Sequence, residues 1–185
     1  MPLSGPAWVS RFPTSRSVDD LAEPFRTNVR RFIAALQASG ATVSVADTLR
    51  PPERAYLMHF SFAIAREDFD PALADSMPGV DIQWVHPDSP TVPSRMAAKD
   101  AAELMVQGYQ IAFKPVLTSR HTEALAIDMS ISWTGTLVIA RADARLLAIT
   151  ATPRTGDNTL LHAVGASYGV IKLVRDPPHW SVDGH

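Results

Sequence analysis

Cysteine is absent from the 185 residues of this sequence. Its absence excludes disulfide bonds and thiolate metal sites, and leaves the chain indifferent to the redox state of its compartment. Long apolar runs are also missing, since none approaches the roughly 18 residues that a membrane-spanning helix needs. Blocks of like charge are missing as well: 17 basic and 19 acidic residues give a formal net charge of −2. Without a basic patch, nucleic acid is not an expected partner.

The composition is that of a folded protein. Hydrophobic residues make up 46% of the chain and charged residues 19%, which provides enough apolar material for a core. At roughly 150 residues per domain, the length predicts a single domain over 18–185. Residues 1–17, which are rich in proline and serine, are expected to form an irregular N-terminal arm.

Hydrophobic spacing predicts an α+β layout. Apolar residues at i, i+3 and i+4 predict helices, whereas alternation with β-branched residues predicts strands. The predicted helices cover 19–40, 53–65, 95–109 and 158–167, with Pro24 as an alternative start of the first and Asp157 or Asn158 as the cap of the last. The predicted strands cover 42–48, 82–85, 125–133, 137–142, 146–150 and 170–175. Helices thus gather mainly in the first half and a mostly antiparallel sheet in the second.

The strand over 125–133 has one apolar face and one face of small polar residues. Its alternation with period two puts Asp128 on the polar face, on the floor of a sheet and not in a loop. His121 stands seven residues earlier, in a polar turn. A turn followed by a strand can bring His121 and Asp128 side by side.

A second carboxylate and imidazole occur in the segment Asp176-Pro177-Pro178-His179. Proline fixes φ, and a polyproline-type turn repeats about every three residues, so the two polar side chains are expected on one side. Two histidines and one aspartate then make a three-ligand set, which in catalytic zinc sites leaves a fourth position for water. Asp176 is left free to act as a general base.

These residues resemble the motifs of a known family. Residues 119–128 read Ser-Arg-His-Thr-Glu-Ala-Leu-Ala-Ile-Asp, which resembles the S-x-H-x-x-G-x-A-x-D motif of zinc-dependent peptidoglycan peptidases. That family includes D-alanyl-D-alanine carboxypeptidases and dipeptidases, and the L-alanyl-D-glutamate endopeptidases of phage endolysins. Its second signature, an acid three residues before a histidine, matches Asp176 and His179, and an arginine just before a helix matches Arg50. The resemblance extends from about residue 25 to the C-terminus.

The resemblance implies a Hedgehog/D,D-peptidase-like fold, with a small, mostly antiparallel sheet and helices packed on one side of it. One position departs from the family pattern, because Ala124 stands where the family has glycine. If the backbone there has positive φ, alanine costs on the order of 1 kcal/mol, but no ligand is lost.

The resemblance also implies a role for each site residue. Zinc would be held by His121, Asp128 and His179, and Asp176 would move the proton from water to the leaving amine. Arg50 would steady the substrate carbonyl and its developing oxyanion. The same pattern gives Ser119 a hydrogen bond to the substrate or to the edge of the site.

Structural alternatives exist for the weaker assignments. Asp176 is also a residue type that forms turns, and Arg50 could pair with Glu53 on the surface. A serine in a turn, such as Ser119, often bonds only to backbone. His162, on the fourth helix, is either packed at the edge of the core or placed to touch the substrate.

The expected activity is hydrolysis of an amide bond in peptidoglycan stem peptides. Asp176 resembles the endopeptidase branch of the family, which has Asp and not Glu at this position, so the resemblance favours an L-Ala-D-Glu-type endopeptidase. A D-alanyl-D-alanine carboxypeptidase and a non-catalytic peptidoglycan-binding module are the alternatives. The first residues lack the pattern of a Sec-type signal peptide. We therefore expect synthesis in the cytoplasm, and action on the cell wall or periplasm after delivery by a phage holin or a secretion apparatus.

Overall fold

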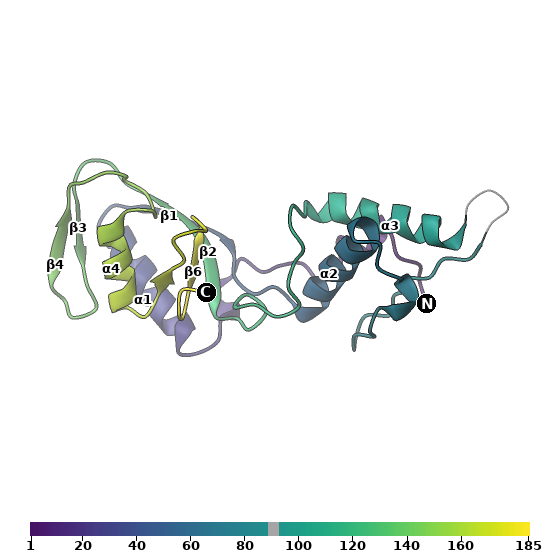
Figure 1. Cartoon of the computed structure of the whole chain (residues 1–185). Helices are drawn as coiled ribbons and strands as arrows, with labels where there is room; N and C mark the ends of the chain where they lie inside the picture. Colours follow the sequence, from purple (N-terminus) through teal and green to yellow (C-terminus); the bar gives the residue numbers. More distant parts are fainter. Residues whose placement is uncertain (89–92) are drawn as a thin grey trace. The chain divides into compact units, whose positions relative to one another are not determined.

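The computed structural model describes residues 1–88 and 93–185. Within these residues lie four α-helices: α1 (Phe25–Ala38), α2 (Pro52–Arg66), α3 (Ser94–Tyr109) and α4 (Thr159–Ser167) (Figure 1). The strands are β1 (Thr42–Asp47), β2 (Ala126–Ser132), β3 (Leu137–Ala140), β4 (Leu146–Ile149), β5 (Ile171–Lys172) and β6 (His179–Ser181). Short 3-10 helices occupy Pro6–Trp8, Val18–Asp20 and Pro71–Leu73. The predicted α+β class is confirmed, and no described helix is long and apolar enough to cross a membrane.

Contacts between residues divide the chain into two compact units. The first comprises Met1–Pro13 and Pro51–Thr118, and the second comprises Thr14–Arg50 and Ser119–His185. The arm over 1–17 and the single domain over 18–185, which the sequence suggests, stay predictions.

The first unit is built on α2 and α3, which pack around an apolar core. Trp8, from the N-terminal segment, is buried in this core, and its backbone oxygen accepts a hydrogen bond from the Tyr109 hydroxyl at 3.1 Å. The strand predicted over 82–85 is wrong, because only an isolated bridge between Gln83 and Leu3 forms there. With one bridge and no ladder, that segment has too few backbone partners to make a strand.

The second unit contains a four-stranded antiparallel sheet in the order β1-β2-β6-β5, and β3 and β4 form a separate hairpin. Helices α1 and α4 pack against Trp180 of this sheet. The Phe32 ring of α1 lies 5.4 Å from the Trp180 ring, between ring centroids. Gly165 of α4 is so close that an added Cβ would lie 2.6 Å from Trp180, so only glycine allows this approach.

The alternation predicted for β2 is confirmed. Ile127, Met129 and Ile131 are buried in the core, whereas Ser130 and Ser132 on the other face are exposed. Asp128 shares the polar face and is half-buried. One face of the sheet therefore carries the core, and the other carries the polar groups of the site.

Element ends differ from the predictions where capping and turns decide them. Helix α1 begins after Pro24, the alternative start, and not at residue 19. Asn158 caps α4 by accepting hydrogen bonds from the amides of Leu160 and Leu161. The strand predicted over 170–175 is reduced to β5, because the chain turns immediately after it.

Candidate metal centre

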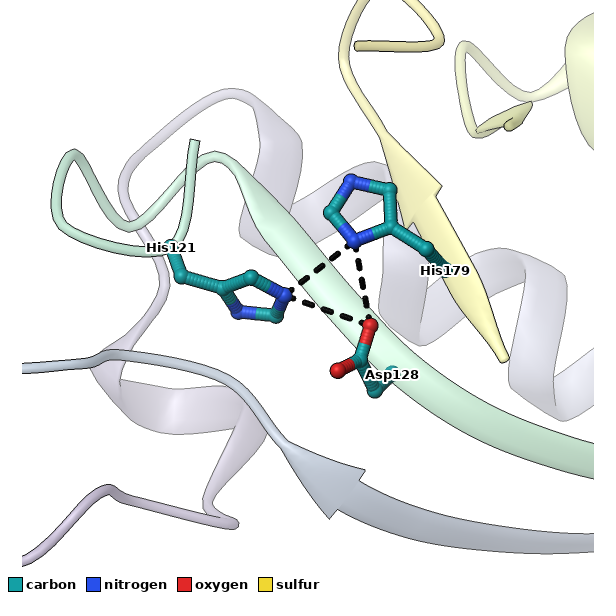
Figure 2. A group of neighbouring side chains, drawn as sticks. All are labelled: His121, Asp128 and His179. Atoms are coloured by element: carbon teal, nitrogen blue, oxygen red, sulfur yellow. Dashed lines mark hydrogen bonds and ion pairs between the residues drawn. The ribbon is translucent and has the colours of Figure 1, made fainter. Parts of the chain in front are cut away.

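Three side chains of the second unit meet at one point (Figure 2). His121 lies in the turn before β2, Asp128 lies in β2, and His179 is the first residue of β6. His121 Nε2 is 3.2 Å from Asp128 Oδ1 and 3.2 Å from His179 Nδ1, and His179 Nδ1 is 3.1 Å from Asp128 Oδ1. These residues form a group that can hold a metal ion.

Backbone carbonyls select the tautomer of each histidine. His121 Nδ1 lies 2.8 Å from the carbonyl oxygen of Thr48, and His179 Nε2 lies 3.0 Å from that of His185. A carbonyl oxygen only accepts hydrogen bonds, so these two nitrogens carry the protons. In the neutral imidazoles, His121 Nε2 and His179 Nδ1 are then lone pairs, and both face Asp128 Oδ1. Three lone-pair atoms converge with no hydrogen between them, which is the arrangement that a cation satisfies.

The size of the triangle fits a small divalent ion. Ligands about 2.0 Å from a tetrahedral ion stand about 3.3 Å apart, and the observed separations are 3.1–3.2 Å. Both histidines are buried, with 5% of His121 and 7% of His179 exposed, so water competes poorly for the site. A set of two imidazoles and one carboxylate suits zinc, among other divalent transition metals.

Hydrogen bonds within the cluster shift two pKa values. Burial by itself would raise the pKa of Asp128, but its hydrogen bonds with His121 and His179 hold that pKa far below the usual value. Burial acts to lower the pKa of His179, yet Asp128 and the His185 carbonyl outweigh it and raise that pKa. Asp128 and His179 therefore each favour the charged form of the other.

Asp176 and Arg50 are connected to the triad through backbone hydrogen bonds. Asp176 is exposed, in the turn that leads into β6; its carbonyl accepts a hydrogen bond from the His179 amide at 3.0 Å, and its negative charge contributes to the raised pKa of His179. Arg50 is half-buried and its backbone amide donates to the His121 carbonyl at 3.0 Å. No side-chain hydrogen bond joins Asp176 or Arg50 to the triad within the described residues.

The segment 176–179 differs from the predicted polyproline-type extension. The His179 amide donates to the Asp176 carbonyl, three residues earlier, and this bond closes a turn. A polyproline II segment has no internal hydrogen bonds, so that conformational prediction is wrong. The stiff connection between Asp176 and His179 is a closed turn instead.

Ser119 and His162 bond to nearby backbone. The Ser119 amide donates to Thr122 Oγ1 at 2.8 Å, and Ser119 Oγ accepts from the Thr122 amide at 3.4 Å, which closes the turn before His121. His162 Nε2 donates to the Gly156 carbonyl at 3.0 Å and its ring stands edge-on to Trp180. Any contact of these two residues with a substrate stays a prediction.

Several residues that support the site carry no signal in the sequence. Thr48 and His185 act through backbone carbonyls, which every residue has. Arg120 donates to the Asp183 carboxylate from Nε, at 3.1 and 3.2 Å, and from Nη2, at 2.5 Å, and so ties the turn before β2 to the C-terminal turn that places His185. Asp47 lies opposite Asp128 across β1 and β2, and burial together with the Asp128 charge raises its pKa.

A cavity of about 450 Å³ lies along β2 in the second unit. Met129 and Pro178, which line it, are the sequence neighbours of Asp128 and His179. The rest of the lining comes from Ser130, Ile131 and Ser132 of β2, from Thr155, Gly156 and Asp157, and from Pro177. Its volume is in the range of small-molecule and peptide sites.

No known protein family and no curated protein matches this sequence. The α+β fold and the His–Asp–His cluster, in which both histidines are buried, are consistent with a metalloenzyme.

Proposed function

We propose that this protein is a zinc-dependent peptidase that hydrolyses an amide bond in peptidoglycan stem peptides, with L-Ala-D-Glu-type endopeptidase activity. One observation carries the proposal: His121 Nε2, Asp128 Oδ1 and His179 Nδ1 converge as three lone-pair donors. Three protein ligands are typical of catalytic zinc sites, whereas structural zinc sites have four.

Zinc bound by these residues would polarise the substrate carbonyl and lower the pKa of a water molecule. Asp176 accepts the proton of the attacking water and returns it to the amine that leaves. Its exposed position in the turn that holds His179 suits this role, because it is open to both solvent and substrate. Arg50 places a fixed positive charge for the oxyanion, and its backbone bond to His121 supports that placement.

The substrate class rests on the resemblance of residues 119–128 and of the Asp176–His179 pair to peptidoglycan peptidases. The cavity along β2 supports a peptide substrate, since it offers room for residues next to the bond that is cut. The exposed hydroxyls of Ser130 and Ser132 can bond to peptide groups there. Delivery to the wall or periplasm by a holin or a secretion apparatus belongs to the same proposal.

Two other functions use the same residues. A D-alanyl-D-alanine carboxypeptidase would need the same ligands and base, and differs in the bond that it cuts. A non-catalytic peptidoglycan-binding module would keep the fold, but it has no use for a carboxylate such as Asp176 beside three metal ligands. Asp176 therefore favours the enzyme.

The test is a digest of purified peptidoglycan with the zinc-loaded protein, analysed by mass spectrometry. A chelator-treated sample and the Asp128→Asn variant serve as controls. New fragments that require metal and Asp128 are expected, and their masses identify the bond. Intact muropeptides in the presence of demonstrably bound zinc would contradict the enzyme proposal and favour the binding module.

A further inference from the structure

Lys172 is a buried lysine whose ammonium group lies inside the turn that precedes His179. Only 7% of the residue is exposed. Its Nζ donates to the backbone carbonyl oxygens of Leu173 at 2.6 Å, Asp176 at 2.5 Å and His179 at 3.2 Å. An ammonium has three N–H donors, so all three are used.

The same three carbonyls also hold the turn together by backbone bonds. The Asp176 amide donates to Leu173 O, the His179 amide to Asp176 O, and the Leu173 amide to His179 O. Each carbonyl thus has one amide donor and one ammonium donor, which fills both of its lone pairs. The three carbonyl oxygens of the turn thus surround the ammonium group of Lys172.

Packing of the core does not by itself explain a lysine at this position. A buried ammonium is costly unless every donor is bonded, and an apolar side chain of similar length would avoid that cost. The turn carries Asp176 and ends at the ligand His179. A charge at its centre therefore sets where these two side chains stand relative to each other.

We propose that Lys172 is a positioning residue of the metal centre: its ammonium group organises residues 173–179 so that His179 and Asp176 are preset for the metal and for the reaction. This inference rests on the His–Asp–His cluster and does not require that the substrate be peptidoglycan. The role of Lys172 can therefore be measured as metal affinity, without an assay of enzymatic activity.

The test compares zinc affinity and unfolding in Lys172→Met and Lys172→Gln with the wild type. In Lys172→Met every carbonyl keeps its amide donor, so the fold is expected to survive. Arg175→Met is the matched control, because Arg175 is an exposed cation in the same turn. Zinc affinity is measured by competition with a chromophoric chelator at fixed pH, and the ligand geometry is followed by the absorption bands of bound Co²⁺.

Lys172→Met is expected to bind zinc about 10- to 100-fold more weakly, the usual effect of removing a group that orients a metal ligand, and to shift the Co²⁺ bands. Lys172→Gln, which restores hydrogen-bond donors without charge, is expected to fall between Met and wild type. Affinity within twofold of wild type in a folded Lys172→Met would overturn the inference. If Lys172→Met and Lys172→Gln both unfold under conditions where Arg175→Met stays folded, Lys172 serves only the stability of the fold. That result would also overturn the inference.

Discussion

Asp128 and His179 stand directly opposite each other on β2 and β6, and this register brings Asp128 Oδ1 to 3.1 Å from His179 Nδ1. Two candidate ligands that are 51 residues apart in the chain are thus held together by a strand ladder. His121 joins them from the turn that leads into β2. A site on a sheet keeps its geometry better than one built on loops alone.

Loss of a ligand should abolish metal binding. His121→Ala leaves two donors, so zinc affinity is expected to fall by more than about 100-fold, beyond what loss of an orienting group costs. Zinc per protein, measured after dialysis, checks this. Ser44→Ala, an exposed serine on β1, is the control and should retain wild-type zinc. Unchanged zinc content in His121→Ala would disprove the ligand assignment.

Asp176→Ala should separate catalysis from binding. Because Asp176 is exposed and makes its hydrogen bonds to the turn through backbone atoms, its side chain can be removed with metal and fold retained. Turnover is expected to fall by about 10²- to 10⁴-fold, the usual contribution of a general base. Zinc content and peptide hydrolysis are measured on the same sample. Loss of zinc together with activity would place Asp176 among the ligands instead.

In the metal-free protein, His179 should contribute stability that is lost as pH rises above 6.5. The pKa of His179 lies above its ordinary value of 6.5, so its proton stabilises the fold below that pH, and the gain disappears as pH rises through the folded pKa. Asp128 has the opposite sign: its pKa lies below 3.8, so its contribution is lost only as pH falls under that value.

Urea midpoints at pH 6 and pH 8, compared between the wild type and His179→Gln, test the shift. The comparison isolates His179, because the lowered pKa values of His86 and His162 make stability rise with pH over the same range. Without metal, the change from pH 6 to pH 8 should be less favourable to the wild type than to His179→Gln. With zinc the wild type should gain stability as pH rises, because the ion must displace the His179 proton and so binds more tightly at high pH. An equal metal-free change in the two proteins would contradict the raised pKa of His179.

Ala124→Gly should stabilise the protein. Ala124 has φ of 58°, in the left-handed region where a side chain is strained and glycine is not. Relief of that strain is expected to raise the free energy of unfolding by about 1 kcal/mol, measured by urea denaturation. Ala166→Gly, at an exposed position in α4, is the control and should destabilise by roughly 0.5–1 kcal/mol. A decrease in stability for Ala124→Gly would show that the strain is absent.

Filling the cavity should weaken substrate binding but leave the metal unaffected. Ser130→Phe puts a large ring at the cavity, so KM is expected to rise about tenfold or more because the substrate pocket is blocked. Zinc affinity should stay at the wild-type value. Leu146→Phe, exposed on the β3–β4 hairpin, is the control for added surface hydrophobicity. An unchanged KM in Ser130→Phe would place the substrate elsewhere.

Much of the candidate site was predictable from local patterns and motifs. Period-two alternation placed Asp128 on the polar face of β2, because side chains in a strand alternate whatever the tertiary contacts are. The residue pattern together with the two family-like motifs predicted one three-ligand cluster, and the structure brings His121, Asp128 and His179 together in a group that can hold a metal ion. A positive φ at Ala124 could be suspected only because the family motif has glycine at this position, since no local sequence pattern requires it.

Features that depend on backbone carbonyls and on strand register became visible only in the fold. The carbonyls of Thr48 and His185 select which nitrogen of each histidine faces Asp128, and a carbonyl has no residue-specific signal. β6 was missed because three residues after two prolines are too short to show a period. Lys172 looked like an ordinary strand residue, since only the closed turn reveals its three carbonyl partners. Side-chain alternation is a local property of the chain, whereas the partners of a buried polar group depend on segments that meet only when the protein folds.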